Sequence, residues 1–182
     1  MACQPADNKA GAAGLTPSEK DTCNHPDAHP NCSFNQMPAN LTNAVTIADA
    51  TEPGDRMRLQ GRLLHADGKT PYAGVRMFLY HTNAAGIYQK RKGDTNIHGY
   101  LHGWLQTGED GEYSIETIRP APYPNGNIPA HVHAIVWVPG AAEAYYVSDF
   151  VFAGDPFVND AYLQNQQRWS LPGGTGIVTL ER

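Results

Sequence analysis

Hydrophobic and polar residues alternate along several short segments of this chain, which has 182 residues. In residues 57–63, apolar or small side chains alternate with arginine and glutamine, a pattern typical of a half-buried strand. Residues 75–82 are mostly apolar on both faces, so we expect a central strand there. Residues 130–138 show the strongest strand pattern, because β-branched residues recur throughout the segment.

The same signals predict further strands. A hairpin is expected where residues 101–107 and 112–117 flank the turn Gly-Glu-Asp-Gly. Residues 145–152 and 176–180 have the composition of two more strands. Helical periodicity is nearly absent, apart from residues 160–168.

Several strands without intervening helices predict an all-β protein folded as an antiparallel β-sandwich or barrel. The 18 glycines and 14 prolines interrupt the chain too often for a helical bundle. Residues 1–43 have no hydrophobic period and are rich in small, polar and proline residues. We therefore expect an irregular N-terminal tail at residues 1–43, followed by one all-β domain at residues 44–182.

All three cysteines lie in the first 32 residues. Cys23 and Cys32 bracket a loop short enough to close as a disulfide in an oxidising compartment. His25 and His29 leave a Cys/His metal cluster as the alternative, although no clear zinc spacing is present. Cys3 is either a leftover thiol or the remnant of a trimmed lipoprotein signal. These features predict an exported protein that is periplasmic, lipoprotein-anchored or secreted.

The net charge of −5 argues against a nucleic-acid-binding surface, which normally carries a basic stripe. No stretch of the sequence approaches the roughly 20 apolar residues of a membrane span. The sequence therefore predicts a protein without nucleic-acid partners and without a transmembrane segment.

Two histidines on one strand are the most informative candidates for chemistry. His131 and His133 share one face of the expected strand, because side chains alternate along a strand. Tyr123 lies eight positions earlier between two prolines, which restrict the backbone on both sides of it. Tyr88, near the end of the expected central strand, is a second candidate. An exposed histidine pair and packed aromatic residues remain the alternative interpretation.

Two imidazoles and two phenols favour one class of metal. A free tyrosine ionises near pH ~10, so its ligation at neutral pH needs a strongly acidifying hard cation. Zinc sites and Fe(II) oxygenases more commonly use cysteine, histidine or carboxylate. Two tyrosinates and one hydroxide balance the charge of Fe(III) while the histidines stay neutral. A catecholate dianion would replace the hydroxide and one tyrosinate without a net change in charge.

The chain resembles the intradiol ring-cleavage dioxygenases, the catechol and protocatechuate dioxygenase family, from about residue 53 to its end. The resemblance rests on the order Tyr…Pro-Tyr-Pro…His-x-His, which is highly specific. The matching segments are Asn-Ala-Ala-Gly-Ile-Tyr at 83–88, Thr-Gly-Glu-Asp-Gly-Glu-Tyr-Ser-Ile-Glu-Thr at 107–117, Pro-Ala-Pro-Tyr-Pro at 120–124, Pro-Ala-His-Val-His at 129–133 and Phe-Ala-Gly-Asp-Pro at 152–156.

The resemblance implies a β-sandwich fold for residues 44–182. It also implies one Fe(III) per chain, held by Tyr88, Tyr123, His131 and His133. It implies that Tyr88 and His131 are equatorial ligands, and that Tyr123 is the axial ligand that leaves when substrate chelates the iron. It further implies that a catechol ring opens between its two oxygenated carbons. Both atoms of O2 then enter a muconate-type diacid, a reaction of aromatic compound catabolism that needs no reductant.

Three positions depart from the family pattern. Ile128 stands where the family usually has an arginine, Asp149 where it commonly has a glutamine, and Tyr80 where a tryptophan is often found. These three residues are the candidates for the substrate pocket. Since such supporting changes can cost 10–100-fold in affinity or activity, metal binding is better supported than rate or substrate. Arg119 is a conjectural source of the missing positive charge.

Two other hypotheses compete with a catechol dioxygenase. One is a non-catalytic β-sandwich binding module of a secreted protein, and the other is an iron-binding relative that has lost catalysis. His98 and His102 are expected in a solvated loop, with substrate contact as the alternative. We expect His81 to be a hydrogen-bonded core residue, because it shares a strand face with apolar neighbours.

Overall fold

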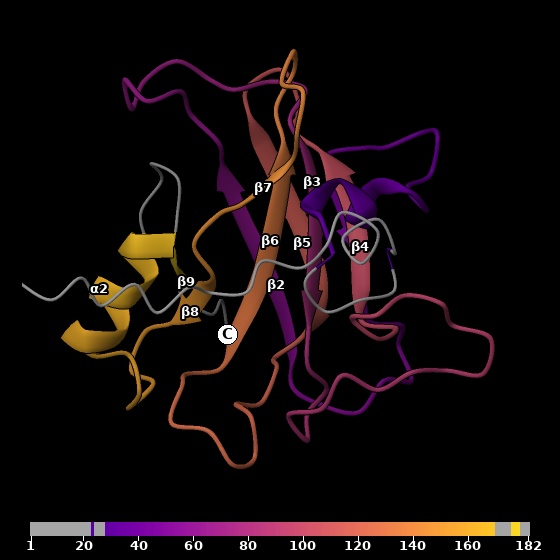
Figure 1. The fold of residues 1–182 in the computed structure, drawn as a ribbon, viewed down its shortest axis with the longest axis vertical. Helices are drawn as coiled ribbons and strands as arrows, with labels where there is room; N and C mark the ends of the chain where they lie inside the picture. Colours follow the sequence, from indigo (N-terminus) through magenta and orange to yellow (C-terminus); the bar gives the residue numbers. More distant parts are fainter. Residues whose placement is uncertain (1–22, 24–27, 170–175, 179–182) are drawn as a thin grey trace, which may run out of the picture.

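The computed structural model describes residues 23, 28–169 and 176–178. Two β-sheets face each other and form a sandwich (Figure 1). The smaller sheet has the strand order β1-β5-β2, and the larger has the order β4-β3-β6-β8-β9, with β7 also paired to β6. The bounds of the strands are β1 Ala44–Thr46, β2 Arg56–Arg62, β3 Arg76–His81, β4 His102–Gln106, β5 Glu112–Ile118, β6 His131–Trp137, β7 Tyr145–Tyr146, β8 Phe150–Phe152 and β9 Gly176–Val178.

The alternation of side chains gives the larger sheet two apolar faces. On β3, Met77 and Leu79 pack between the sheets against Leu59 of β2 and Ile115 of β5. Phe78 of β3 and its neighbours point to the outer face, where they form a second cluster. This confirms β3 as a central strand, since it pairs with β4 on one side and β6 on the other.

The expected hairpin between residues 101–107 and 112–117 is wrong. The strands β4 and β5 form where the sequence predicts them, but they belong to different sheets. Thr107 extends the pairing with β3 by hydrogen bonds to Val75, whereas Gly111 accepts a hydrogen bond from the N–H of Leu63, next to β2. The turn therefore carries the chain from one sheet to the other. The alternation of residues reports burial and does not identify the partner strand.

Two more expectations about strands need correction. Residues 145–152 form two short strands, β7 and β8, which pair with different parts of β6. The short strand β1 was not expected, and it pairs with β5 in parallel, as β8 does with β9. The sandwich is therefore all-β and mostly antiparallel, with two parallel pairs. The expected helix is present as α2, Asp160–Trp169.

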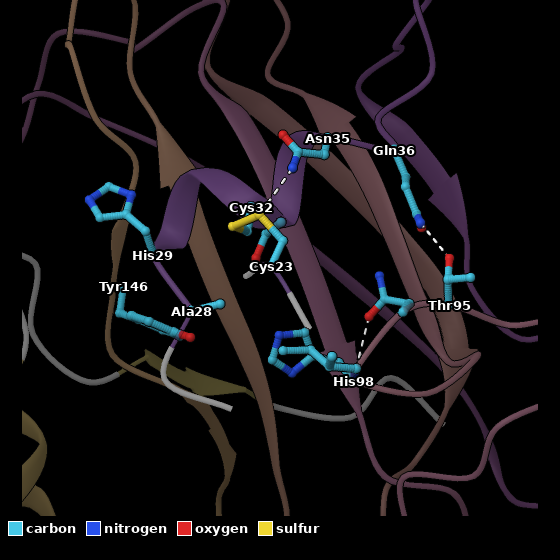
Figure 2. A pocket seen from close by; sticks show the side chains of 12 residues that line it. Cys23, Ala28, His29, Cys32, Asn35, Gln36, Thr95, His98 and Tyr146 are labelled. Carbon is cyan, nitrogen blue, oxygen red and sulfur yellow. Dashed lines mark hydrogen bonds between the residues drawn. A yellow bond between two sulfur atoms is a disulfide. The ribbon is translucent and has the colours of Figure 1, made fainter. Parts of the chain in front are cut away.

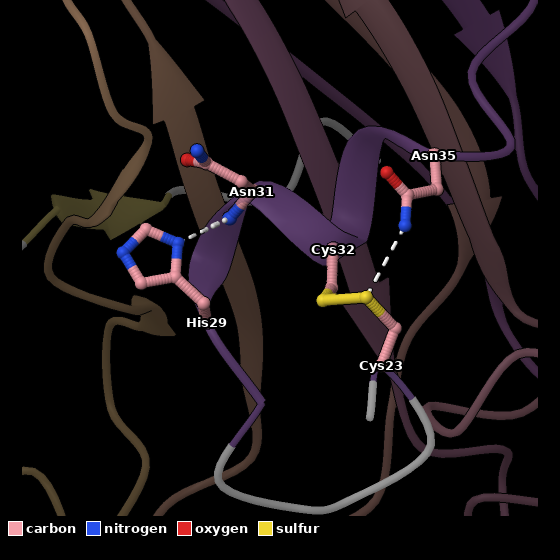
Figure 3. The surroundings of a disulfide bond; sticks show 5 residues. All are labelled: Cys23, His29, Asn31, Cys32 and Asn35. Carbon is pink, nitrogen blue, oxygen red and sulfur yellow. Dashed lines mark hydrogen bonds between the residues drawn. A yellow bond between two sulfur atoms is a disulfide. The ribbon is translucent and has the colours of Figure 1, made fainter. Parts of the chain in front are cut away.

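A short 3-10 helix, η1 (Pro30–Phe34), lies over the outer face of the larger sheet. Cys23 and Cys32 form the expected disulfide, with their Cα atoms 5.3 Å apart (Figure 3). Phe34 is only 7% exposed and packs edge-on against Trp137. The segment after residue 30 is thus part of the packed structure, although the division of the chain after residue 43 stays a prediction.

Within the described part of the chain, no helix is long and apolar enough to cross a membrane.

Candidate metal centre

The two candidate histidines lie on the outer face of β6. Val132 points into the core between the sheets, so His131 and His133 on either side of it point the other way. His131 is buried and His133 is partly buried. The ring of Tyr80, from the neighbouring strand β3, stacks on His133 with the ring centroids 4.6 Å apart. Strand alternation therefore brings both imidazoles to one place, as the sequence predicts.

Tyr88 follows a tight turn at the end of β3. The side-chain oxygen of Asn83 accepts hydrogen bonds from the N–H groups of Ala85 and Ile87, and its backbone N–H donates to the carbonyl of Ile87. These bonds reverse the chain within five residues, the usual role of an asparagine in a turn. The turn directs the Tyr88 ring towards the histidines, and the centroids of the Tyr88 and His133 rings lie 6.5 Å apart.

Gly86 brings this turn against the loop that carries Tyr123. Its φ of +78° belongs to the left-handed region, which glycine adopts without strain. A Cβ at this position would lie 2.2 Å from the carbonyl oxygen of Pro122. The two loops are also joined by hydrogen bonds from Ala121 N–H to the carbonyl of Asn83 and from the Thr82 hydroxyl to the carbonyl of Ala121. The proline-rich loop is therefore held directly beside Tyr88.

Four potential ligand atoms converge between these elements. The hydroxyl oxygens of Tyr88 and Tyr123 lie 2.7 Å apart. The Tyr123 hydroxyl lies 3.4 Å from Nε2 of His131, and Nε2 of His131 lies 3.0 Å from Nε2 of His133. The structure thus brings together the four residues that the sequence nominates as metal ligands. Their ligation of iron stays a prediction.

The partners of the two imidazoles determine which ring nitrogen faces the cluster without a proton. Nδ1 of His131 lies 2.7 Å from the carbonyl oxygen of Pro129, and Nδ1 of His133 lies 2.6 Å from a carboxylate oxygen of Asp149. Both partners only accept, so each Nδ1 carries the hydrogen in the neutral ring. Two bare Nε2 atoms then face each other at 3.0 Å. This arrangement fits a shared cation, which such lone pairs coordinate.

Burial affects the protonation of all four groups. It raises the pKa of both Tyr88 and Tyr123 above that of a free phenol. Burial and the neighbouring His133 lower the pKa of His131. The metal-free site therefore contains neutral phenols and a neutral His131 at pH 7. A metal bound by the tyrosines has to displace their protons, which requires a strong Lewis acid.

Asp149 adds a carboxylate to the cluster. One ligand atom each from His131, His133 and Asp149 lies within 4.8 Å of the others. However, the Asp149 oxygen that contacts His133 accepts from Nδ1, on the side of the ring away from the tyrosines. The tyrosine hydroxyls lie on the Nε2 side. Asp149 is therefore a hydrogen-bond partner of a candidate ligand, and the His/His/Tyr/Tyr set is the better candidate for the metal.

Comparison with known proteins identifies the family of this chain. A sequence profile of the family described as "Dioxygenase" matches residues 30–171. This chain belongs to the intradiol ring-cleavage dioxygenase family. It is 29% identical over 127 residues to chlorocatechol 1,2-dioxygenase of Rhodococcus opacus, covering 60% of this chain and 48% of that protein. It is 30% identical over 141 residues to hydroxyquinol 1,2-dioxygenase of a Rhizobium species, covering 63% and 46%. The chain thus spans about half the length of the curated relatives it matches.

Solved structures support the fold. The dioxygenase domain of a dioxygenase–carbohydrate-binding protein fusion from Streptomyces sp. SirexAA-E superimposes with a TM-score of 0.54 at 18% identity, covering 79% of this chain and 88% of that chain. Hydroxyquinol 1,2-dioxygenase from Pseudomonas putida DLL-E4 gives a TM-score of 0.55 at 19% identity, covering 81% and 63%. At these identities the similarity establishes the β-sandwich alone.

The three departures from the dioxygenase pattern lie around the cluster. Tyr80 is buried between His133 and His98, and it stacks on both rings. Ile128 is half-buried in the loop that joins Tyr123 to β6. Asp149 contacts His133 directly. Arg119 does not take part in the cluster contacts described above, because its guanidinium lies 4.3 Å from the centroid of the Phe152 ring and it lines an open cavity with Asp55 and Asp155.

His98 lies in a loop as expected but is partly buried, whereas His102 lies on β4, so the expectation of a loop is wrong for His102. His98 stacks on Tyr80 with the ring centroids 3.8 Å apart, and burial lowers its pKa to about 4. Nδ1 of His102 lies 2.6 Å from the carbonyl oxygen of Gly99, and the His102 ring packs near Phe78. His81 is a hydrogen-bonded core residue as expected, because its ring nitrogens contact the carbonyl of Thr82 and the hydroxyl of Thr117.

A cavity of about 100 Å³ lies beyond His98 (Figure 2). Its lining includes the Cys23–Cys32 disulfide, His29, Gln36, Tyr146 and the loop around His98. The side-chain amide of Gln36 donates to the hydroxyl of Thr95 at 2.6 Å and thus joins the segment after η1 to that loop. Tyr80 stacks on the His98 ring and on the His133 ring, so it links the cavity wall to the metal cluster.

Tyr162 is a contact of the site that sequence reasoning missed. Its hydroxyl donates to the second carboxylate oxygen of Asp149 at 3.3 Å. Tyr162 lies on α2, and nothing in the sequence pattern of that helix marks it, because the contact depends on how the helix packs. Asn83 and Gly86 were detectable in principle, since an asparagine followed three residues later by glycine is a turn signal.

Proposed function

We propose that this protein is a non-haem Fe(III)-dependent dioxygenase that cleaves a catechol ring between its two hydroxylated carbons. The observation that carries the proposal is the convergence of two tyrosine hydroxyls and two bare imidazole nitrogens, with successive contacts of 2.7, 3.4 and 3.0 Å. This donor set combines anionic oxygen with neutral nitrogen, which suits a hard trivalent cation. The names of the curated relatives, which act on chlorocatechol, hydroxyquinol and catechol, support the substrate class.

In this proposal, Tyr88, Tyr123, His131 and His133 hold the metal. Bound Fe(III) would supply the Lewis acidity that keeps both catechol oxygens anionic and the ring electron-rich towards O2. Tyr123 is the candidate acceptor for one catechol proton, because its raised pKa makes the phenolate a good base once it is displaced. The reaction adds both atoms of O2 to the two carbon atoms of the broken bond, so catechol and O2 account for every atom of the diacid.

The residues around the cluster shape the substrate site. Tyr80 stacks on His133 and covers one side of the candidate metal centre. Ile87, which precedes Tyr88 in the chain, is an exposed apolar residue with 53% of its surface accessible. Ile128 replaces the usual arginine with an apolar side chain, and Asp149 adds negative charge. These features favour an uncharged catechol over one that carries a ring carboxylate.

The direct test is iron loading followed by oxygen uptake. The reconstituted protein should bind one Fe(III) per chain and become coloured, because tyrosinate bound to Fe(III) absorbs visible light. It should then consume one O2 per catechol and form a muconate-type diacid. A colourless, iron-free protein after reconstitution contradicts the proposal. An O2 electrode with catechol, protocatechuate, hydroxyquinol and caffeoyl-type catechols identifies the substrate.

A second candidate function is iron binding without efficient turnover. It is favoured by Ile128, which provides no hydrogen-bond donor where the family usually has five in an arginine. Losing one such donor at other active sites lowers kcat by roughly 10²–10³. A coloured, iron-loaded protein that consumes no O2 with any catechol supports this alternative.

We also propose that the protein works in an oxidising compartment outside the cytoplasm. The Cys23–Cys32 disulfide supports this location, since disulfides are rare in reducing compartments. Thiol counting on protein isolated from its native source, without reductant, tests the proposal. Two free thiols at Cys23 and Cys32 would contradict it.

A further inference from the structure

Asp149 lies at an irregularity of the larger sheet. Tyr146 pairs with Ile135, and Phe150 pairs with Val132, so three residues, 147–149, lie opposite the two residues 133–134. One extra residue on one strand is a β-bulge, which re-aims side chains and is frequent beside active sites. Here the bulge directs Asp149 at the ring of His133. The Asp149 side chain is 13% exposed, so this carboxylate is largely withdrawn from water.

Both oxygens of the Asp149 carboxylate have a donor. Oδ1 lies 2.6 Å from Nδ1 of His133, and Oδ2 accepts the hydroxyl of Tyr162 at 3.3 Å. The helix α2 thus supports the carboxylate from the side opposite the histidine. This chain of contacts runs from α2 to Asp149 and then to His133, whose Nε2 faces the candidate ligands.

The two histidines differ in the group behind each ring. The Nδ1 atom of His131 contacts a neutral acceptor, the carbonyl of Pro129, whereas that of His133 contacts an anion. A carboxylate behind a metal-bound imidazole fixes the tautomer and raises the basicity of the coordinating nitrogen. A neutral glutamine, common at this position in the family, cannot supply that charge.

We propose that Asp149 is a positioning residue that holds His133 in its Nδ1–H tautomer and increases the electron donation from its Nε2 to a bound metal. Tyr162 holds the second oxygen of the carboxylate in place. The tautomer of His133 follows from the contacts of its ring nitrogens alone. The increase in electron donation to a metal rests on the proposed function.

Two substitutions separate the hydrogen bond from the charge. Asp149→Asn keeps an oxygen that accepts from Nδ1 but removes the negative charge, whereas Asp149→Ala removes both. Tyr162→Phe deletes only the hydroxyl that contacts Asp149, and it serves as the mild variant if the Asp149 variants fold poorly. Asp160→Asn is the matched control, because this exposed carboxylate lies at the start of α2.

The first measurement uses metal-free protein and ¹⁵N shifts of the histidine rings. We expect the Nδ1–H tautomer of His133 in the wild type and in Asp149→Asn, and a mixture of tautomers in Asp149→Ala. A pure Nδ1–H tautomer in Asp149→Ala would overturn the proposal. This measurement tests the role of Asp149 without iron. Failure of the wild type to bind iron would contradict the proposed function but would leave this test of Asp149 valid.

The second measurement uses iron-loaded protein. In Asp149→Asn we expect Fe(III) affinity, measured against a competing chelator, to fall by roughly 10–100-fold. The tyrosinate-to-iron band should move to longer wavelength, because a less electron-rich iron accepts charge more easily. Tyr162→Phe should shift the band in the same direction by less, and Asp160→Asn should leave it unchanged. Unchanged affinity and an unshifted band in Asp149→Asn would also overturn the proposal.

Discussion

The hydroxyl oxygens of Tyr88 and Tyr123 lie 2.7 Å apart, although 35 positions separate the two residues along the chain. Each tyrosine lies on an irregular loop, and the loops meet where the backbone of Gly86 approaches Pro122. The candidate metal centre therefore depends on a loop–loop contact as much as on the histidines of β6.

Gly86→Ala should separate the two tyrosine loops. The new Cβ would meet the carbonyl of Pro122 at 2.2 Å, in a backbone conformation that L-residues adopt at a cost of about 1–2 kcal/mol. We expect a lower unfolding midpoint and weak iron binding. The matched control is Gly68→Ala, because Gly68 also has a positive φ, of +67°, but no atom lies within 4 Å of the added Cβ. The control variant therefore carries only the cost of the backbone conformation. Equal unfolding midpoints and iron affinities for the two variants would refute this role of Gly86.

The two tyrosines should respond differently to loss of the hydroxyl. Tyr88→Phe, like His131→Ala, should remove iron or abolish turnover, because each deletes a ligand that stays bound throughout the proposed reaction. Tyr123→Phe should retain iron, shift the visible band and slow substrate chelation. Absorption spectra and stopped-flow mixing with catechol check these outcomes, with Tyr72→Phe as the control, since Tyr72 stacks on His65 outside the cluster. If neither spectrum nor rate changes in Tyr123→Phe, Tyr123 is not a ligand.

His81 should make the fold sensitive to acid. Burial lowers its pKa to about 4, whereas an unfolded histidine titrates near 6.5. Below pH 6.5 the unfolded chain gains a proton that the folded chain refuses. The contribution of neutral His81 to the free energy of unfolding is therefore complete above pH 6.5. This contribution is lost as the pH falls towards 4, by at most about 1.4 kcal/mol per pH unit.

Denaturant titrations between pH 7 and pH 4.5 check the role of His81. His81→Asn should have a lower free energy of unfolding at pH 7 but a flatter pH dependence than the wild type. His65→Asn, at an exposed position, is the control and should keep the wild-type slope. An unchanged slope in His81→Asn means that other groups cause the acid sensitivity.

Ile128→Arg should change the substrate preference. The wild type should use catechol better than protocatechuate, because Ile128 offers no cation and Asp149 repels a ring carboxylate. An added guanidinium should raise kcat/KM for protocatechuate, relative to kcat/KM for catechol, by tenfold or more. This change corresponds to one charge-assisted hydrogen bond of about 1.5–3 kcal/mol. Ile128→Met is the neutral control. A wild type that clearly prefers protocatechuate contradicts this reading of Ile128.

Phe34 should contribute to the stability of the fold but not to metal binding. Its ring packs on the larger sheet in the cluster that contains Phe78 and Ile135. Phe34→Ala should lower the free energy of unfolding by about 3 kcal/mol, while the folded protein still binds one iron. Chemical denaturation and iron titration measure the two effects. Met37→Ala is unsuitable as a control because Met37 is partly buried and packs against the same cluster, so Leu64→Ala, at an exposed position, serves instead.

The sequence by itself determined much of this protein. Period-two alternation located β2, and runs of apolar residues located β3 and β6. The alternation of side chains along a strand placed His131 and His133 on one face. Prolines around Tyr123 marked a rigid loop, and two cysteines nine positions apart marked the disulfide. Each of these inferences depends on residues close together in the chain, where local stereochemistry limits the possibilities.

Only the tertiary structure decided which distant segments meet. It assigned β4 and β5 to different sheets, placed Phe34 in the outer cluster, and brought Tyr162 to Asp149. It also showed that Asp149 contacts His133 through a bulge between β7 and β8. These contacts depend on sheet pairing and on the packing of loops across the sandwich. Hydrophobic patterning reports whether a side chain is buried, but it does not identify the neighbours among which it is buried.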